Sequence, residues 1–183
     1  MRIVGGELKG RKFNPPAKNW PTRPTTDFAR EGLFNVLANT WEFEDLAVLD
    51  LFAGTGSIGF EFASRGAGRV DMVEKESKNS NLLQKTIASL SAEKVRVIHS
   101  DVLKYIRYCS FHYDIIFADP PYDLDILPEI PDRLFEANIL EAEGWFILEH
   151  GSSQTFSSHP NYQKTKKYGS VHFSFFTNLT PNL

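Results

Sequence analysis

The sequence predicts an α/β domain of the doubly wound class, built on a mostly parallel sheet. Between residues 47 and 149, short apolar runs alternate five times with longer amphipathic stretches, and glycines separate the first run from the helix expected after it. Such alternation requires right-handed crossovers whose helices cover both faces of a parallel sheet. We therefore expect a Rossmann-like sheet of seven strands that ends in an antiparallel hairpin.

The pattern predicts the individual elements in the following order. Short apolar runs predict strands at Ala47–Phe52, Arg69–Val73, Val95–His99, Tyr113–Ala118 and Trp145–Glu149. Helical spacing of apolar residues predicts helices at 26–37, 57–64, 77–90, 102–108 and 126–135, the last interrupted near Pro128 and Pro131. The segments Gln163–Tyr168 and Val171–Thr177 face each other across Gly169 and Ser170, which predicts the terminal hairpin.

The first 24 residues differ in composition from the remainder. Arg2–Val4 and Arg11–Phe13 are expected to form a small β-hairpin, which continues into a proline-rich extended arm. No linker or repeat divides the chain. We therefore expect one domain over residues 1–183, in which residues 1–24 are an appendage to a core of residues 25–183.

Composition narrows the functional classes. The chain has 183 residues, a net charge of -3 and a single cysteine, Cys109, which excludes both an intramolecular disulfide and a multi-cysteine zinc site. The five histidines lack ligand spacing, so no metal is expected. No stretch has the length and hydropathy of a membrane helix, and the first residues lack the apolar centre of a signal peptide. We expect a monomeric cytoplasmic protein with no membrane contact.

The charge is unevenly distributed along the chain. Residues 1–31 contain seven Lys and Arg against three Asp and Glu, whereas the remaining residues are acidic in sum. A basic segment on an acidic body is compatible with a nucleic-acid partner, although a solvated N-terminal segment is the alternative. The residues expected to contact a nucleic acid are Arg2, Lys9, Arg11, Lys12 and Arg23.

A glycine-rich turn joins the first predicted strand to the next helix. Gly54, Gly56 and Gly59 satisfy the spacing G-x-G-x-x-G, which is typical of a cofactor site when a strand precedes it and a helix follows. Glycines let the backbone approach a ligand, and the helix N-terminus offers free N–H groups. A turn without a ligand is the alternative. The residues of this turn expected to bind a cofactor are Asp50, Phe52, Ala53, Gly54, Thr55 and Gly56.

The charge of Asp50 distinguishes two cofactor classes. Glu74, after the second strand, could bind ribose hydroxyls of either a nicotinamide cofactor or S-adenosylmethionine. Asp50 would repel a pyrophosphate and attract the ammonium group of S-adenosylmethionine, which favours the methyl donor. Lys75, Asp101 and Val102 complete the expected site, with Asp101 placed to accept a hydrogen bond from the adenine amino group. A helix N-cap is the alternative role of Asp101.

The tetrapeptide Asp119-Pro120-Pro121-Tyr122 follows the fourth predicted strand. Because ligands lie beyond the carboxyl ends of strands in open sheets, Asp119 is expected to face the same crevice as the glycine turn. Two prolines offer rigid carbonyl acceptors and no N–H donors, which suits a target that donates hydrogen bonds, such as the exocyclic amine of a base. Tyr122 offers a ring on which a base can stack. We predict that all four residues are catalytic.

Together these motifs resemble the bacterial 16S ribosomal RNA guanine-N2 methyltransferases of the RsmD type, within the class I S-adenosylmethionine-dependent methyltransferases. The glycine turn and Asp119–Tyr122 are similar to the family pattern, and Phe60, Phe62 and the acidic run Asp123–Asp125 depart from it. Further similar segments are Arg2–Gly6, Gly10–Lys12, Arg23–Asp27, Arg30–Glu31, Leu33–Asn35, Ser64–Ala67 and Lys167–Gly169.

The resemblance implies methyl transfer to the exocyclic N2 of a guanine in 16S ribosomal RNA, within a small-subunit particle. Asp119 and the Pro120 carbonyl would hold the amine, and Tyr122 would stack on the base. Three alternatives remain open: an adenine-N6 methyltransferase acting on DNA or another RNA, a nicotinamide oxidoreductase, and an RNA-binding module without activity. The charge of Asp50 and the lack of a second domain oppose the oxidoreductase.

Overall fold

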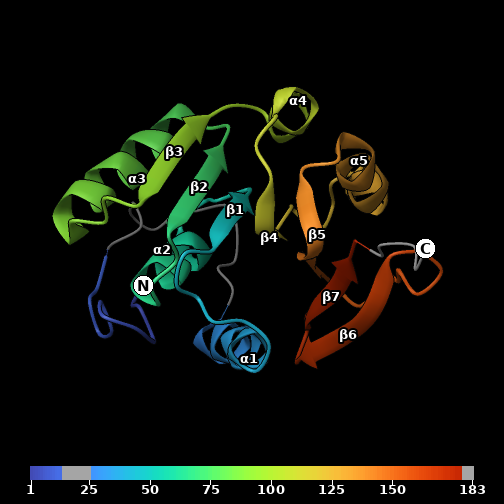
Figure 1. Cartoon of the computed structure of the whole chain (residues 1–183), viewed down its shortest axis with the longest axis horizontal. Coiled ribbons are helices and arrows are strands. Elements are labelled where there is room, and N and C mark those ends of the chain that lie inside the picture. Colours follow the sequence, from blue (N-terminus) through green and yellow to red (C-terminus); the bar gives the residue numbers. More distant parts are fainter. Residues whose placement is uncertain (14–25, 179–183) are drawn as a thin grey trace.

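The computed structural model describes residues 1–13 and 26–178, which form one seven-stranded sheet with helices on both faces (Figure 1). The spatial order of the strands is β3-β2-β1-β4-β5-β7-β6. The first five strands are parallel, and β7 is antiparallel to both β5 and β6, which confirms the predicted fold class. The strands are β1 (Ala47–Leu51), β2 (Arg69–Glu74), β3 (Val95–His99), β4 (Tyr113–Ala118), β5 (Leu140–His150), β6 (Tyr162–Tyr168) and β7 (Val171–Thr177).

The helices divide between the two faces of the sheet. Helices α1 (Asp27–Ala38), α2 (Ser57–Ser64) and α3 (Ser77–Leu90) supply one core cluster, and α4 (Val102–Tyr108) and α5 (Ile130–Ala137) supply the other. Successive strand residues point to opposite faces, so neighbours along one strand belong to different clusters. Val48 and Leu49 of β1 are an example, and neither is exposed to solvent. This double coverage explains why the central strands consist almost entirely of apolar residues.

One predicted irregularity is confirmed, and one strand starts earlier than predicted. The helix expected at 126–135 is interrupted near its prolines, as a 3-10 turn (Leu127–Glu129) followed by α5, because prolines lack the N–H that a continuous helix requires. Strand β5 begins at Leu140, five residues before the predicted start at Trp145. The pairing with β4 shifts register between these two residues, and Glu143 has a φ of 62°. The bulge contains acidic residues, so the first residues of the strand do not form an apolar run that the sequence pattern could detect.

The N-terminal segment (residues 1–13) forms the small antiparallel hairpin that was expected, with a bridge from Arg2 to Lys12 and backbone N–H groups of Ile3 and Phe13 that donate to Arg11 and Met1. The segment also packs against α2. Ile3 and Phe13 bury their side chains in the core, and the backbone N–H of Val4 donates to Oε2 of Glu61 at 2.9 Å. The segment is therefore part of the packed structure.

Candidate active site

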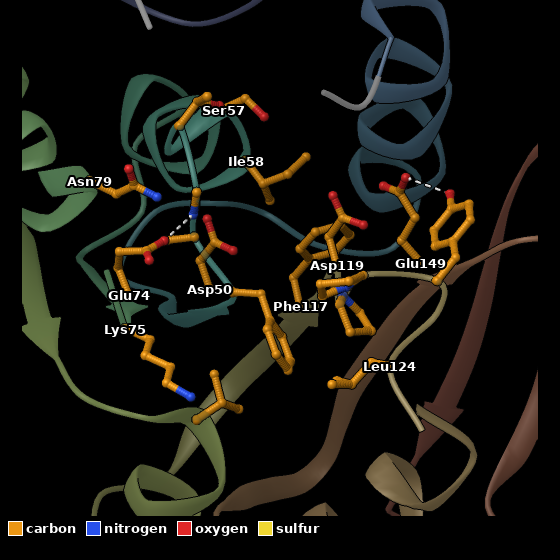
Figure 2. Close-up of a pocket in the computed structure, with 18 of the residues that line it drawn as sticks. Asp50, Ser57, Ile58, Glu74, Lys75, Asn79, Phe117, Asp119, Leu124 and Glu149 are labelled. Carbon is orange, nitrogen blue, oxygen red and sulfur yellow. Dashed lines mark hydrogen bonds between the residues drawn. The ribbon is translucent and has the colours of Figure 1, made fainter. Parts of the chain in front are cut away.

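The carboxyl ends of β1 to β5 open onto a cavity of about 850 Å³. The α1 N-terminus and the β6–β7 turn close it from another side, through Thr26 and residues 168–171. Figure 2 shows Glu74 and Lys75 at one end of the cavity and Asp119 and Glu149 at the other. Its size is typical of a site that encloses a small-molecule ligand almost completely.

Strand register directs three carboxylates of the cavity to the same face of the sheet. Ala118 of β4 pairs with β1 on one side and β5 on the other, so Asp119 and Glu149 follow the paired residues directly. Asp50, Asp119 and Glu149 each lie two residues after a core residue on the α1–α3 face, and alternation directs them to that face. Those core residues are Val48, Phe117 and Ile147.

The glycine turn bends sharply between β1 and α2. Phe52 and Gly54 have φ values of 61° and 54°, and Gly56 begins α2 with a φ of 76°. A Cβ at Gly56 would lie 2.6 Å from side-chain atoms of Leu83 and Phe60, so a larger residue would be strained and would clash. Gly56 does not line the cavity, whereas Phe52, Gly54 and the intervening Ala53 do.

Backbone N–H groups fix the two carboxylates at the glycine end. Asp50 accepts a hydrogen bond from the N–H of Gly59 at 2.9 Å. Glu74 accepts from Gly54 at 2.9 Å and from Glu76 at 2.7 Å. Burial raises the pKa of Asp50 to about 7, and the charge of Glu74 adds to this, although the bond from Gly59 lowers it. A positive ligand group would restore the ionised form of Asp50.

Asp101 makes the capping contact considered for it and a further contact with Lys75 that was not expected. Its Oδ1 caps α4 by accepting from Leu103 and Lys104, and its Oδ2 lies 3.4 Å from the Lys75 ammonium. Asp101, Lys75 and Val102 all line the cavity. The capping role is therefore present in the structure, and it holds the side chain at the cavity wall.

The far end of the cavity combines acidic and aromatic groups. The hydroxyl of Tyr122 donates to Oε1 of Glu149 at 3.0 Å, and a Cβ at Gly151 would lie 3.1 Å from the Tyr122 ring. Burial raises the pKa of Asp119 well above its ordinary value, and the charges of Glu149 and Asp50 raise it further. Pro120, Pro121 and Tyr122 line the cavity with Asp119, and Tyr122 remains 43% exposed.

The described cavity wall is strongly acidic. Seven acidic side chains line it against one lysine, Lys75. Such a wall attracts cations and repels anions, including a pyrophosphate. The seven residues are Asp50, Glu74, Glu76, Asp101, Asp119, Asp123 and Glu149.

Four of the residues expected to contact RNA are described, and they lie outside the cavity wall. Lys9, Arg11 and Lys12 are exposed on the N-terminal segment. Arg2 is also exposed, and its Nε lies 3.1 Å from Asp27. Arg23 lies outside the described residues.

Several lining residues were missed by the sequence analysis. Glu149 follows the apolar run of β5 directly, and the same rule that identified Asp119 could have identified it. The α1 and hairpin residues have no comparable signal, because only the tertiary fold brings them to the site. The missed residues are Thr26, Ser57, Ile58, Glu76, Asn79, Leu103, Phe117, Asp123, Leu124, Ile126, Glu149, Tyr168, Gly169, Ser170 and Val171.

Two kinds of feature are absent from residues 1–13 and 26–178. No helix in these ranges is long and apolar enough to cross a membrane. The same part of the chain holds no group of three or more His, Cys, Asp or Glu side chains arranged to bind a metal ion.

Comparisons with known proteins agree with one another. A sequence profile of the family described as Conserved hypothetical protein 95 matches residues 1–177. The Ribosomal RNA small subunit methyltransferase D of Escherichia coli (strain K12) is 38% identical over 150 residues, which cover 81% of this chain and 71% of that protein. The solved structure of Escherichia coli yhhF, described as a candidate methyltransferase, has a TM-score of 0.84 at 32% identity and covers 97% of both chains.

A more distant solved structure has the same fold. It is a candidate methyltransferase in complex with SAH, with a TM-score of 0.65 at 17% identity, and the match covers 81% of this chain and 49% of that one. At this identity the likeness concerns the fold alone.

Proposed function

The chain belongs to the Conserved hypothetical protein 95 family, and from this premise we propose that it transfers a methyl group from S-adenosylmethionine to the exocyclic N2 of a guanine in 16S ribosomal RNA. Membership confirms the resemblance found in the motifs. Methylation of ribosomal RNA is the activity that named relatives carry. The guanine N2 target and the small-subunit particle as substrate are the finer parts of the proposal.

The observation that carries the proposal is the acidic cavity that ends at Asp119-Pro120-Pro121-Tyr122. S-adenosylmethionine carries positive charge on its sulfonium and ammonium groups, whereas a nicotinamide dinucleotide carries a negative pyrophosphate. With seven acids against one lysine in the described wall, the field favours the methyl donor. The far end then offers acceptors to a base that donates hydrogen bonds.

The residues of the glycine end fit this methyl donor. Asp50 would hold the ammonium group, and Glu74, whose oxygens keep further acceptor capacity beyond Gly54 and Glu76, would hold ribose hydroxyls. Asp101 would accept from the adenine amine. When bound, the methyl donor supplies a methyl group activated by a positively charged sulfur.

The far end would make the guanine amine a better nucleophile. The N2 lone pair is delocalised into the ring, so the amine reacts only when its hydrogens are held and the nitrogen pyramidalises. Ionised Asp119 and the Pro120 carbonyl would accept these hydrogens, and their acceptance strengthens as positive charge develops on nitrogen. N2 forms its bond to the methyl carbon, the carbon–sulfur bond breaks, and N2 then loses one proton. The raised pKa of Asp119 suits it to receive that proton.

Tyr122 would bind the base after the base has left its neighbours in the RNA. Its ring is held by Gly151 and its hydroxyl by Glu149, so the exposed part of the ring has a fixed position. A fixed ring costs less conformational entropy when the base stacks on it.

Base analysis of the product tests this function. Small-subunit particles from a strain without the gene are incubated with the protein and methyl-labelled S-adenosylmethionine, and the RNA is digested to nucleosides for mass spectrometry. We expect N2-methylguanosine at one position in 16S ribosomal RNA. Label in N6-methyladenosine would support the adenine alternative, and unlabelled RNA of every kind would contradict a methyltransferase acting on RNA.

A further inference from the structure

Phe28 is a large apolar side chain left exposed beside the cavity. It lies in the first turn of α1 and is 70% exposed, which is unusual for a residue of this size. Two residues before it, Thr26 caps α1 and lines the cavity. The ring therefore lies next to the opening of the site, and the proposed reaction does not use it.

Phe28 has a defined position because its ring contacts Tyr168. The two ring centroids are 5.8 Å apart with an interplanar angle of 77°, an edge-to-face arrangement. Tyr168 itself lines the cavity and approaches α1 closely at Gly32, where a Cβ would lie 2.1 Å from its ring. Figure 1 shows α1 beside the β6–β7 hairpin. We call Thr26, Phe28 and Tyr168 the α1 rim.

Basic side chains accompany the α1 rim, in contrast to the acidic cavity. Arg2 is exposed and bonded to Asp27, the residue before Phe28. Lys166 is exposed on β6 and, by alternation, shares the strand face of Tyr168. Asp123 and Asp125 give the segment after Tyr122 the opposite charge. An RNA strand whose base enters the cavity would meet less repulsion for its phosphates along the α1 rim.

We propose that the α1 rim binds the RNA strand next to the target nucleotide, and that the base of a flanking nucleotide stacks on Phe28. This proposal rests on the proposed function and deepens it, because it adds a second stacking surface outside the reaction site. Stacking on an aromatic ring tolerates any base, so Phe28 would contribute affinity and hold the extruded strand without selecting sequence.

Methylation kinetics on unmethylated small-subunit particles test the proposal. Phe28→Ala is expected to raise KM for the particles about tenfold while calorimetry shows unchanged affinity for S-adenosylhomocysteine. Phe28→Trp should stay within about twofold of the wild type, because an indole ring also stacks. Phe28→Leu keeps an apolar side chain and should lose most of the affinity that Phe28→Ala loses.

Tyr108 provides a matched control. It is also 70% exposed, lies at the end of α4 and does not line the cavity. Tyr108→Ala should leave KM within about twofold of the wild type. An unchanged KM in Phe28→Ala, full activity of Phe28→Leu, or an equal loss in Tyr108→Ala would each overturn the stacking role.

Photocrosslinking identifies the partner independently of the rate. With a photoreactive benzoylphenylalanine at position 28 and small-subunit particles as the probe, we expect an RNA adduct within a few nucleotides of the methylated guanine. A crosslink to a ribosomal protein contradicts the proposal, and so does the absence of any crosslink to the particle. If the wild-type protein methylates adenine, the proposed guanine target is refuted and the Phe28 comparison remains valid. If the wild type is active and Phe28→Ala has the same KM, only the role of Phe28 is refuted.

Discussion

The two ends of the cavity hold their carboxylates in different ways. At the glycine end, backbone N–H groups of Gly54, Gly59 and Glu76 bond directly to the acids. At the far end, the hydroxyl of the Tyr122 side chain donates to Glu149, and the charges of Glu149 and Asp50 act on Asp119.

This difference suits two different ligands. A backbone donor is fixed by the fold, so the glycine end presents the same surface to a cofactor that never changes. At the far end the carboxylates repel one another, and an incoming amine can reduce this repulsion. The reduction is greatest where positive charge develops on the nitrogen. The structure thus combines a preformed half with a half whose electrostatics change when the substrate enters.

Removal of the acid at the far end should produce the largest effect. Asp119→Ala is expected to lower kcat by about 10²- to 10³-fold, because the developing charge on nitrogen loses its acceptor. Affinity for S-adenosylhomocysteine, measured by calorimetry, should persist. The matched control is Asp125→Ala, an exposed acid of the same segment that does not line the cavity. Equal rates for Asp119→Ala and the wild type would remove Asp119 from the mechanism.

Neutralising Asp50 should weaken cofactor binding and raise the free energy of unfolding. Asp50→Asn keeps an acceptor for Gly59 and loses the charge, so S-adenosylhomocysteine should bind on the order of 10- to 100-fold more weakly. The pKa of Asp50 is about 7 in the fold and 3.8 in a solvated chain, so the folded protein retains a proton that the unfolded chain loses between these values. The free energy of unfolding therefore falls as pH rises through this window.

Thermal unfolding without ligand checks the same substitution. Asp50→Asn should be more stable than the wild type at pH 8, by up to on the order of 4 kcal/mol, and the gap should narrow at pH 5. A gap that is independent of pH would mean that the pKa of Asp50 is the same in the folded and the unfolded protein, so that burial does not raise it.

Glu149→Gln probes the charge coupling at the far end. If ionised Asp119 is the active form, the methylation rate rises with pH through its pKa. Loss of the Glu149 charge lowers that pKa, so the acidic limb of the pH–rate profile should move to lower pH. Tyr122→Phe is the control, since it removes the hydroxyl bonded to Glu149 without changing charge. An acidic limb that Glu149→Gln leaves in place would disprove the coupling.

The smallest effect is expected on the N-terminal segment. Arg11→Ala and Lys12→Ala should each reduce the slope of log affinity against log salt by about 0.7 to 0.9 if each contacts one phosphate. Filter binding of small-subunit particles measures this slope. Lys94→Ala is the control, because Lys94 is exposed beside the start of β3, at the edge of the sheet opposite the cavity. Unchanged slopes for both variants would exclude the segment from RNA binding.

The sequence predicted the parallel part of the fold closely because buried strands and capped helices leave local patterns. Strand β3 and helix α4 have the bounds expected for them. The predicted start of β5 was wrong because a bulge with Glu143 at positive φ interrupts the apolar run. A pattern that relies on continuous hydrophobicity cannot detect a strand that continues through such an interruption.

The site divides in a similar way. Asp50 and Asp119 could be predicted because each lies at the carboxyl end of a strand, within a recognisable motif. Glu149 has the same position on β5 but belongs to no motif, and Phe28 lies beside the cavity because its ring contacts Tyr168 of the β6–β7 hairpin, which lines it. Contacts between distant segments depend on the whole fold, so the local sequence holds no trace of them.

The contacts between the N-terminal segment and α2 limit how this segment could be exchanged with that of a relative in a chimera. Val4 donates to Glu61 and Leu8 to Ser64, while Ile3 and Phe13 fill space in the core. A chimera that receives this segment would also need a glutamate and a serine at matching positions on its own helix. The exposed lysines and arginines of the basic surface can therefore vary one by one, whereas replacing the whole segment with that of a relative would leave Glu61 of this chain buried beside a foreign backbone.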